Sequence, residues 1–187
     1  MILPVYAYGQ PVLKQKAVEI NPEYPNLKQL IANMWDTMYS ANGVGIAAPQ
    51  IGLPIRLFVI DSTQSENEER VGFVGFKRVF INAKRMVPDS GEKNSQEEGC
   101  LSIPGIRGEV ARNSQLHLEW FDENFKKHSE TFDGLNARII QHEFDHIEGI
   151  LFTEHLSAVK RNLIRNKLEN IRRGKIDADY KLNVVGR

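Results

Sequence analysis

The motif H-E-F-D-H at residues 142–146 constrains this 187-residue chain more than any other feature. Apolar residues recur every three to four positions around it, which is typical of a buried helix. In a helix, His142 and His146 lie one turn apart on the same face, with Cβ atoms about 5–6 Å apart. Glu143 lies beside that face, where its carboxylate reaches a water molecule without binding the metal. The pattern therefore predicts a helix that offers two imidazoles to one metal ion, as metal-assisted hydrolysis requires.

A third metal ligand is expected from elsewhere in the chain, because an open zinc or iron site also needs one. Downstream, neither Glu154 nor His155 stands at the spacing used by metalloproteases with H-E-x-x-H-x-x-G-x-x-H. Upstream, the only cysteine, Cys100, stands between Gly99 and a Pro-Gly pair at 104–105. A lone cysteine is usually a small buried hydrophobe, but beside an incomplete metal site it becomes a candidate ligand. The alternative interpretation of the motif is a pair of core histidines with satisfied hydrogen bonds.

The composition suits one soluble domain that spans residues 1–187, because 41% hydrophobic residues are enough for a sizeable core. Lys plus Arg and Asp plus Glu number 24 each, so no net charge favours nucleic acid, and we expect no specific DNA binding. The single cysteine excludes an internal disulfide. No apolar run approaches the roughly 18 residues of a membrane span, and no signal peptide opens the chain. We therefore expect a cytoplasmic protein without a membrane segment.

The pattern of apolar residues predicts an α+β fold, with antiparallel or mixed sheets packed around the central H-E-x-x-H helix. An amphipathic N-terminal helix is predicted over 26–39, with Asn26 as its cap, and a glycine-rich loop follows at 43–52. Strands are predicted at residues 56–61, 79–82, 109–112, 116–120 and 128–132. The polar segments 62–75 and 89–96 are expected to be exposed, the first of them as a hairpin excursion.

A long C-terminal helix is predicted over residues 157–174, capped by Ser157, with a mobile tail at 176–187. Its expected buried face consists of Val159, Leu163, Ile164, Leu168 and Ile171. Its basic face consists of Lys160, Arg161, Arg165, Lys167, Arg172 and Arg173. Such a face is usually only solvated. Ordinary surface or edge positions are expected for three further histidines, His117, His128 and His155.

Three motifs of this chain resemble the signatures of one enzyme family. They are G-V-G-I-A-A-P-Q-I-G at 43–52, E-G-C-L-S-I-P-G at 98–105 and Q-H-E-F-D-H-x-x-G at 141–149. Their order and separation are similar to those of peptide deformylase, in the bacterial type that has a C-terminal helix. The chain departs from the family pattern in its two long polar segments and at Arg138 of the pocket helix.

The resemblance implies that Cys100, His142 and His146 are metal ligands and that Glu143 is the general acid/base. The implied metal is one Fe(II) per chain, which zinc, nickel or cobalt replace in sites of this kind. A metal-bound water then acts as the nucleophile. The implied protein is an iron-dependent hydrolase of protein biosynthesis, which removes the N-formyl group from the N-terminal methionine of newly synthesised proteins and releases formate.

The resemblance also implies roles around the metal ligands. The Gln50 side chain and the Leu101 backbone N–H would donate hydrogen bonds to the formyl oxygen, and Gly45 would contact the peptide main chain. A buried ion pair between Glu98 and Arg112 is implied behind the metal loop. The methionine pocket is implied to be lined by Val44, Leu135 and Ile139.

Two alternatives to this function remain at the level of the sequence. The first is a metalloprotease that cuts internal peptide bonds, against which the upstream cysteine and the absent downstream histidine count. The second is a non-enzymatic ribosome-associated protein with a structural metal, which would require a fourth protein ligand. The resemblance implies N-formylmethionyl nascent peptides as substrates, and the basic C-terminal helix is a candidate for docking on the ribosome, where such peptides emerge.

Overall fold

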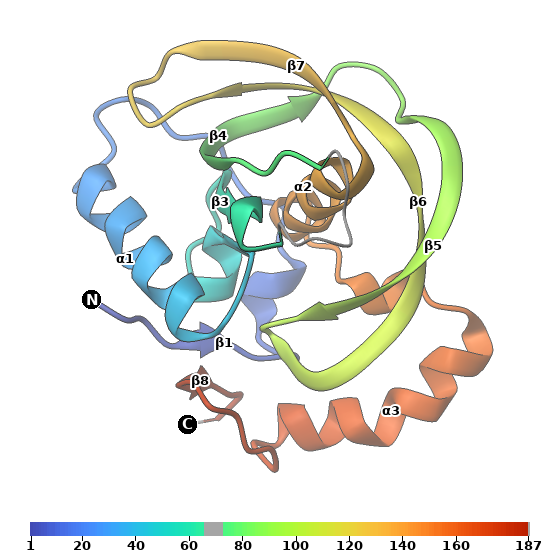
Figure 1. The fold of residues 1–187 in the computed structure, drawn as a ribbon. Coiled ribbons are helices and arrows are strands. Elements are labelled where there is room, and N and C mark those ends of the chain that lie inside the picture. The colour runs from blue at the N-terminus through green and yellow to red at the C-terminus, as the bar shows by residue number, and fades with distance from the viewer. Residues whose placement is uncertain (66–72, 187) are drawn as a thin grey trace.

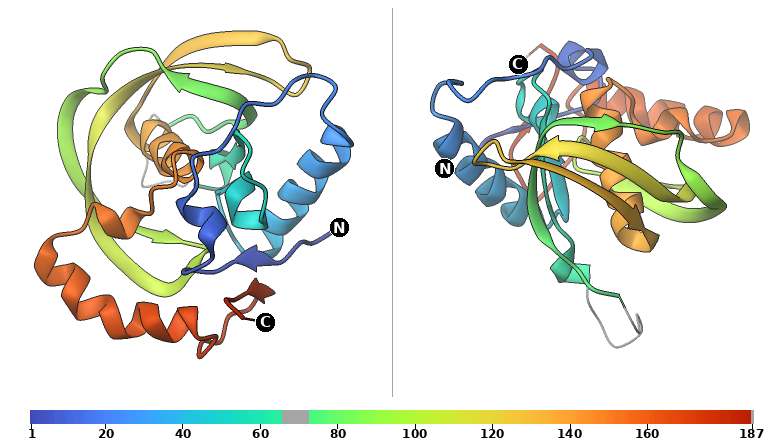
Figure 2. Two further views of the ribbon diagram at one scale, coloured as in Figure 1. Left: turned by 180° about the vertical axis from the view of Figure 1, so that it is seen from behind. Right: turned by 90° about the horizontal axis from the view of Figure 1, so that it is seen from above.

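The central helix of the protein is the one that the motif predicts. The computed structural model describes residues 1–65 and 73–186. Helix α2 (Gly134–Ile147) lies in the middle of the molecule, and the long strands β5 (Ser90–Cys100) and β6 (Ile103–Phe121) curve around it (Figure 1). Helices α1 (Leu27–Ser40) and α3 (Ala158–Arg172) lie on the outside (Figure 2). The predicted α+β class and its central helix are therefore confirmed.

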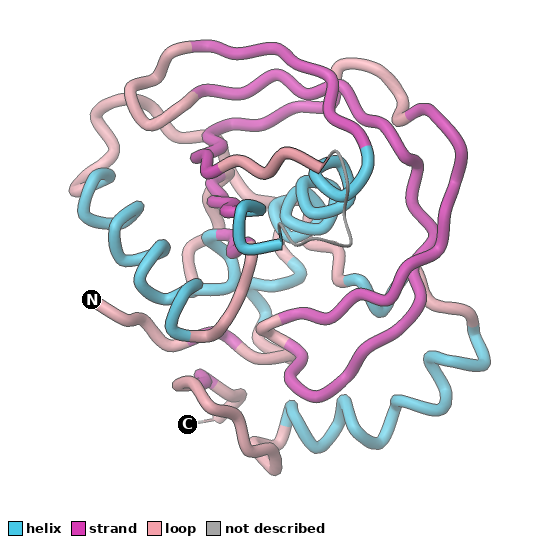
Figure 3. Tube along the Cα trace, viewed as in Figure 1, coloured by secondary structure: helices cyan, strands magenta, loops and turns pink. Residues whose placement is uncertain are grey.

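A six-stranded sheet forms the framework around α2 (Figure 3). Its strand order is β2-β3-β4-β6-β5, with β7 also paired to β6, and its pairings are antiparallel. Its remaining strands are β2 (Gly45–Ala47), β3 (Leu57–Asp61), β4 (Lys77–Arg85) and β7 (Lys127–Asp133). Helix α2 packs its apolar residues against aromatic side chains of this sheet, among them Phe58, Phe80 and Trp120. This packing fixes the helix, and with it both histidines of the motif.

The β5–β6 hairpin is longer than the sequence predicts. The segment 89–96 is largely exposed, as expected, but most of it lies in strand β5, which we did not predict. The segments 109–112 and 116–120, predicted as separate strands, belong to the single strand β6. The polar residues between them do not interrupt the strand, because Asn113 and Gln115 are paired with β5.

The glycine-rich segment 43–52 is not a plain loop, contrary to the prediction. It contains strand β2, at the edge of the sheet, and a short 3-10 helix, η2 (Ala48–Ile51). The predicted N-terminal helix is present as α1, but Asn26 makes no side-chain cap and adopts a left-handed conformation with φ of 55°. Its role at the start of the helix is therefore one of backbone conformation.

Helix α3 begins as predicted, because the Ser157 side chain accepts a hydrogen bond from the Lys160 N–H. Ile164, Leu168 and Ile171 are buried, but Val159 and Leu163 are 73% and 71% exposed. The expected buried face is therefore wrong at those two positions. The helix packs on the core only through a narrow stripe, against a cluster whose further members include Leu13, Phe152 and Leu156.

The C-terminal segment differs most from expectation. Residues 176–187 were predicted to be a mobile tail, but strand β8 (Leu182–Asn183) pairs in parallel with β1 (Val5–Tyr6). The Asn183 side chain accepts a hydrogen bond of 2.8 Å from Gln10, and Val184 is buried. The two ends of the chain therefore lie side by side (Figure 1).

Short 3-10 helices complete the fold at η1 (Pro11–Lys14), η3 (Ser62–Ser65) and η4 (Phe152–Glu154). Half of the hairpin excursion predicted for 62–75, residues 66–72, lies outside the described residues. In the part of the chain that the structure describes, no helix is both long and apolar enough to cross a membrane.

Candidate metal centre

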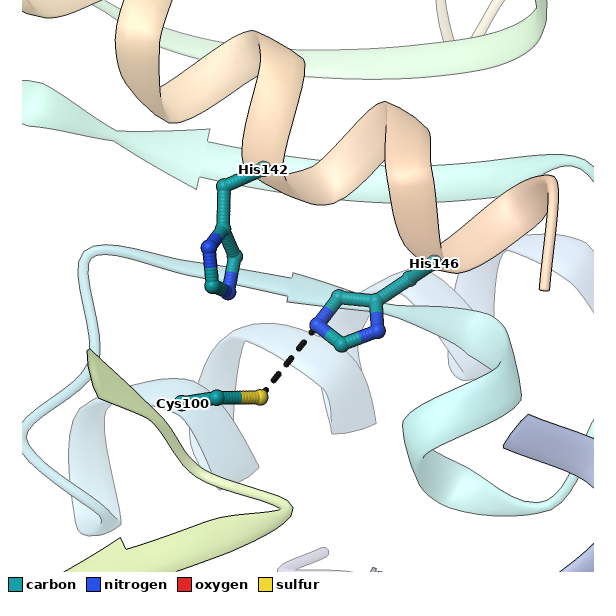
Figure 4. A group of neighbouring side chains, drawn as sticks. All are labelled: Cys100, His142 and His146. Carbon is teal, nitrogen blue, oxygen red and sulfur yellow. Dashed lines mark hydrogen bonds between the residues drawn. The ribbon is translucent and has the colours of Figure 1, made fainter. Parts of the chain in front are cut away.

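Three side chains that are far apart in the sequence converge between α2 and the end of β5. His142 and His146 come from α2, and Cys100 is the last residue of β5. Their ligand atoms all lie within 4.8 Å of one another, and the Cys100 Sγ atom lies 3.3 Å from Nε2 of His146 (Figure 4). The structure thus brings the candidate third ligand to the pair of histidines in the motif.

This donor set fits a first-row transition metal. One thiolate and two imidazoles suit zinc or iron, with bonds of about 2.0–2.3 Å that place neighbouring ligand atoms less than about 4 Å apart. The 3.3 Å separation of Cys100 Sγ and His146 Nε2 already meets that requirement. Nδ1 of His142 lies 3.0 Å from a Glu98 oxygen, so its Nε2 is the nitrogen left for a metal. Three ligands leave one position of a tetrahedral ion for water or substrate.

The electrostatics of the three side chains favour the metal-binding form of the cysteine. Burial opposes ionisation of Cys100, but the charge of His146 and hydrogen bonds from both histidines outweigh it and lower the pKa of the thiol to about 5. Burial also lowers the pKa of His142, but hydrogen bonds with Cys100 and Glu98 raise it well above its usual value. Cys100 is therefore a thiolate near neutral pH, which is the form that binds metals.

Glu143 lies beside the three ligands and is almost fully buried, at 4% exposure. Burial raises the pKa of its carboxyl to about 7, although the charges of His142 and His146 oppose the rise. Among the described residues, its Oε2 atom has no hydrogen-bond partner. A Cβ atom at Gly45 would lie 2.6 Å from Oε1 of Glu143, so only glycine leaves room for this side chain. The carboxyl is thus held in place with one oxygen available to a bound water.

The side chain of Gln50 is directed toward Cys100. Its Oε1 atom accepts a hydrogen bond of 2.8 Å from the Ala47 N–H, which fixes the side-chain amide. Its Nε2 group donates to Ser102 Oγ at 3.3 Å and to Cys100 Sγ at 3.5 Å. Leu101 follows Cys100 in the turn between β5 and β6. Two candidate donors therefore flank the cysteine.

A buried ionic network lies behind the three candidate metal ligands. Arg112 donates to both Glu98 oxygens, at 2.7 and 2.9 Å, and to Asp145 at 2.8 Å. Arg138 also donates to Glu98, at 2.7 Å. His155, expected to be an ordinary surface histidine, lies 2.8 Å from Asp145 and so extends the network toward the surface. The implied pair of Glu98 and Arg112 is thus the core of a larger cluster.

Besides His155, reasoning from the sequence also missed Arg138 and Asp145 as members of this network. Arg138 stands four residues before His142, so the two share a face of α2, and that spacing was the available signal. Asp145 lies inside the H-E-x-x-H motif, where only its burial, at 6% exposure, shows that it needs a partner. His117 and His128 are ordinary strand positions, as expected. His117 of β6 contacts Ser129 and Thr131 of the paired strand β7, and His128 contacts Asp122 in the turn between these strands.

Two of the three candidate ligands, Cys100 and His142, line a cavity of about 710 Å³. Its lining includes all four residues assigned to substrate contacts by the resemblance, namely Val44, Gly45, Leu135 and Ile139. Ile139 is buried and Leu135 half-buried, so this part of the wall is apolar. The lining also includes residues 177–180 of the C-terminal segment, which we did not assign to the site.

Comparisons with known proteins agree on one family. Its sequence profile, described as polypeptide deformylase, matches residues 2–162. The peptide deformylase of Christiangramia forsetii is 52% identical to the chain, over 97% of this chain and 95% of that protein. The peptide deformylase of Flavobacterium psychrophilum is 51% identical, over 99% of this chain and 98% of that protein. The crystal structure of peptide deformylase from Thermus thermophilus matches with a TM-score of 0.81 at 35% identity, covering 93% of this chain and 99% of that one.

Proposed function

This chain belongs to the peptide deformylase family and is therefore an enzyme, and we propose that it removes the N-formyl group from the N-terminal methionine of newly made proteins. The observation that carries the proposal is the convergence of Cys100, His142 and His146, next to a cavity that Cys100, His142 and Glu143 line. The products are formate and a free amino terminus. We place this reaction in the cytoplasm, where proteins are synthesised.

Cys100, His142 and His146 would hold the metal, which we propose to be Fe(II), with zinc, nickel or cobalt as replacements. When bound, the metal supplies Lewis acidity that lowers the pKa of water toward neutrality. The Glu98 carboxylate, 3.0 Å from Nδ1 of His142, would fix the tautomer that presents Nε2 to the metal. The thiolate that the metal needs is available at neutral pH, because the pKa of Cys100 is about 5.

Glu143 would move the proton during hydrolysis. Its carboxylate takes a proton from the attacking water as the water oxygen bonds to the formyl carbon. It then returns that proton to the peptide nitrogen as the carbon–nitrogen bond breaks, so formate leaves and an amine remains. A pKa of about 7 suits both steps, because a group with that pKa is a usable base and a usable acid near neutral pH.

Gln50 and Leu101 would stabilise the oxyanion that develops on the formyl oxygen. Preorganised donors of this kind each contribute about 3 kcal/mol to a transition state. The bond from the Ala47 N–H to Gln50 Oε1 supports the role, because it turns Nε2 toward Cys100.

The substrate would lie along strand β2, whose position at the edge of the sheet suits pairing with an extended peptide. Gly45 would contact the peptide main chain. The methionine side chain would enter the apolar part of the cavity, which is lined by Val44, Leu135 and Ile139.

The decisive experiment is to measure formate release from an N-formyl-Met-Ala-Ser peptide, using protein purified without oxygen and analysed for metal. We expect formate release from the formyl peptide and no acetate release from its N-acetyl counterpart. Glu143→Gln should retain the metal but lose at least about a hundredfold in rate, as expected when a general acid/base is removed. Glu109→Gln, at an exposed position of β6, is the matched control and should be unaffected.

The same experiment separates the two alternatives. A metalloprotease would produce new internal peptide ends without formate, and a structural metal site would produce neither product. A closed structural site would also need a fourth protein ligand, whereas the cluster in the described chain has three.

We also propose that α3 docks on the ribosome, where formylated nascent peptides emerge. An enzyme held there would meet its substrates at a raised effective concentration. The exposed cations of α3 support this proposal, because contacts of Lys and Arg with RNA phosphates supply affinity without sequence specificity.

A further inference from the structure

The turn that follows the cysteine ligand consists of only two residues. Strand β5 ends at Cys100 and β6 begins at Ile103, and these two residues are paired. Leu101 and Ser102 therefore form the tip of the hairpin. The tip follows directly on a proposed metal ligand and contains the N–H that we assign to the oxyanion, so its orientation matters for the reaction.

Both carbonyl groups of this turn are bound by segments from outside the hairpin. The Tyr8 N–H donates to the Ser102 carbonyl at 2.8 Å, and the Tyr180 hydroxyl donates to the Leu101 carbonyl at 2.7 Å. Tyr8 belongs to the N-terminal arm and Tyr180 to the C-terminal segment. These two segments are themselves joined by the β1–β8 pairing. The turn is thus held by both ends of the chain at once.

The surroundings of Tyr180 keep its hydroxyl in position to bind the Leu101 carbonyl. Its ring is partly buried and packs on the apolar cluster that includes α1 and Leu101. Burial raises the pKa of Tyr180 above its usual value, and the charges of Cys100 and Asp179 add to the rise. A tyrosine hydroxyl carries its proton at neutral pH even without this rise, and a carbonyl only accepts, so Tyr180 is the donor of the bond. The same residue lines the cavity that holds Cys100 and Glu143.

We propose that Tyr180 is a positioning residue of the active site: by binding the Leu101 carbonyl it fixes the conformation of the turn, and with it the direction of the Leu101 N–H toward the formyl oxygen. This inference rests on the proposed function, in particular on the role of Leu101 as an oxyanion donor. A donor aimed at the developing oxyanion acts mainly in the transition state, so its misalignment lowers kcat and changes KM little.

The test is Tyr180→Phe in the full-length, metal-loaded enzyme. This change removes one hydroxyl and keeps the ring, so we expect kcat to fall about three- to tenfold, the range for one lost hydrogen bond, with KM within about twofold. Tyr24→Phe is the matched control, because Tyr24 also packs on the same cluster but does not line the cavity. It should leave both constants unchanged.

A second readout does not depend on turnover. Hydrogen exchange of the amides in residues 99–103 should be faster in Tyr180→Phe than in the wild type and in Tyr24→Phe. Unchanged exchange, an unchanged kcat, or a rise in KM alone would overturn the positioning role. A wild-type protein that released no formate would overturn the proposed function and this inference together, whereas a failure confined to Tyr180→Phe leaves the proposed function intact.

Discussion

The Glu98 carboxylate and Nδ1 of His142 lie 3.0 Å apart, and both side chains are largely buried. Carboxylates in this position orient a ligating histidine and raise its basicity. Glu98 is held in turn by Arg112 and Arg138, each at 2.7 Å. The orientation of His142, a candidate metal ligand, therefore depends on a buried cluster of charges behind it.

The first prediction concerns the stability that this cluster provides. Arg112→Met should destabilise the metal-free protein by about 3–5 kcal/mol, because it leaves buried carboxylates without their main partner. Asp145 would keep His155 and the more distant Arg85, at 3.7 Å. Urea unfolding measures the change. Arg107→Met is the matched control, since Arg107 pairs with Glu97 in the same hairpin but both side chains are 61% exposed. That exposed pair should contribute less than about 1 kcal/mol to the free energy of unfolding. Equal destabilisation by Arg112→Met and Arg107→Met would contradict the argument.

The second prediction is that Cys100 binds the metal. Cys100→Ser should lose most of the bound iron on purification without oxygen, because a serine hydroxyl is not deprotonated as readily as a thiol with a pKa of about 5. His146→Asn should lose it as well. His128→Asn serves as the control, because His128 contacts Asp122 in the β6–β7 turn. Metal analysis of the three variants decides the matter, and one full equivalent of iron in Cys100→Ser would disprove the assignment.

The placement of His142 and His146 on one face of a helix could be predicted from the sequence, because the features that set it are local. His142 and His146 are one helical turn apart in any α-helix, so the spacing alone places them on one face. The alternation of buried residues in β6, such as Val110, Leu116 and Leu118, likewise follows from the two-residue period of a strand. Cys100 needed a further argument, namely that the helix alone supplies too few ligands.

Features that depend on distant contacts could not be predicted in this way. Strand β5 exposes nearly all of its residues from Ser90 to Glu97, so it shows no apolar alternation for a pattern to detect. Val159 and Leu163 fall at helical spacing with the buried residues of α3, but only the packed structure shows that they face solvent. Tyr180 enters the site because β8 pairs with β1, and no local pattern predicts that two-residue pairing.

The third prediction concerns pH. In protein stripped of metal with a chelator, alkylation of Cys100 should be nearly independent of pH from about 6 to 8 and should slow below about 5. The pKa of the thiol is about 5, so the reactive thiolate persists above that pH and is lost as protons are added. An ordinary thiol, with a pKa of about 8.5, would instead react roughly a hundredfold faster at pH 8 than at pH 6. Adding metal should protect Cys100 from alkylation. An alkylation rate that rises steeply toward pH 8 would show that the pKa of the thiol is not lowered.

The last prediction is that the exposed face of α3 docks on ribosomal RNA. Val159 and Leu163 are exposed, and Lys160 and Lys167 lie next to them on the same side of the helix. Arg172 and Arg173 are engaged by Glu169, so they are poorer candidates for phosphate contacts. Removing α3 is not a usable test, because Ile164, Leu168 and Ile171 belong to the core. Substitutions on its exposed face are required instead.

Lys160→Glu combined with Lys167→Glu should weaken co-sedimentation with ribosomes. The slope of the logarithm of the binding constant against the logarithm of the salt concentration should become shallower by about two, one for each lysine that no longer binds a phosphate. The same charge change at Lys93 and Lys126, on exposed parts of the β-hairpins, is the matched control. Both double variants should deformylate a short peptide at the wild-type rate, because none of the four lysines lines the cavity. If the two double variants sediment equally at every salt concentration, general charge explains the association, and α3 is a solvated surface.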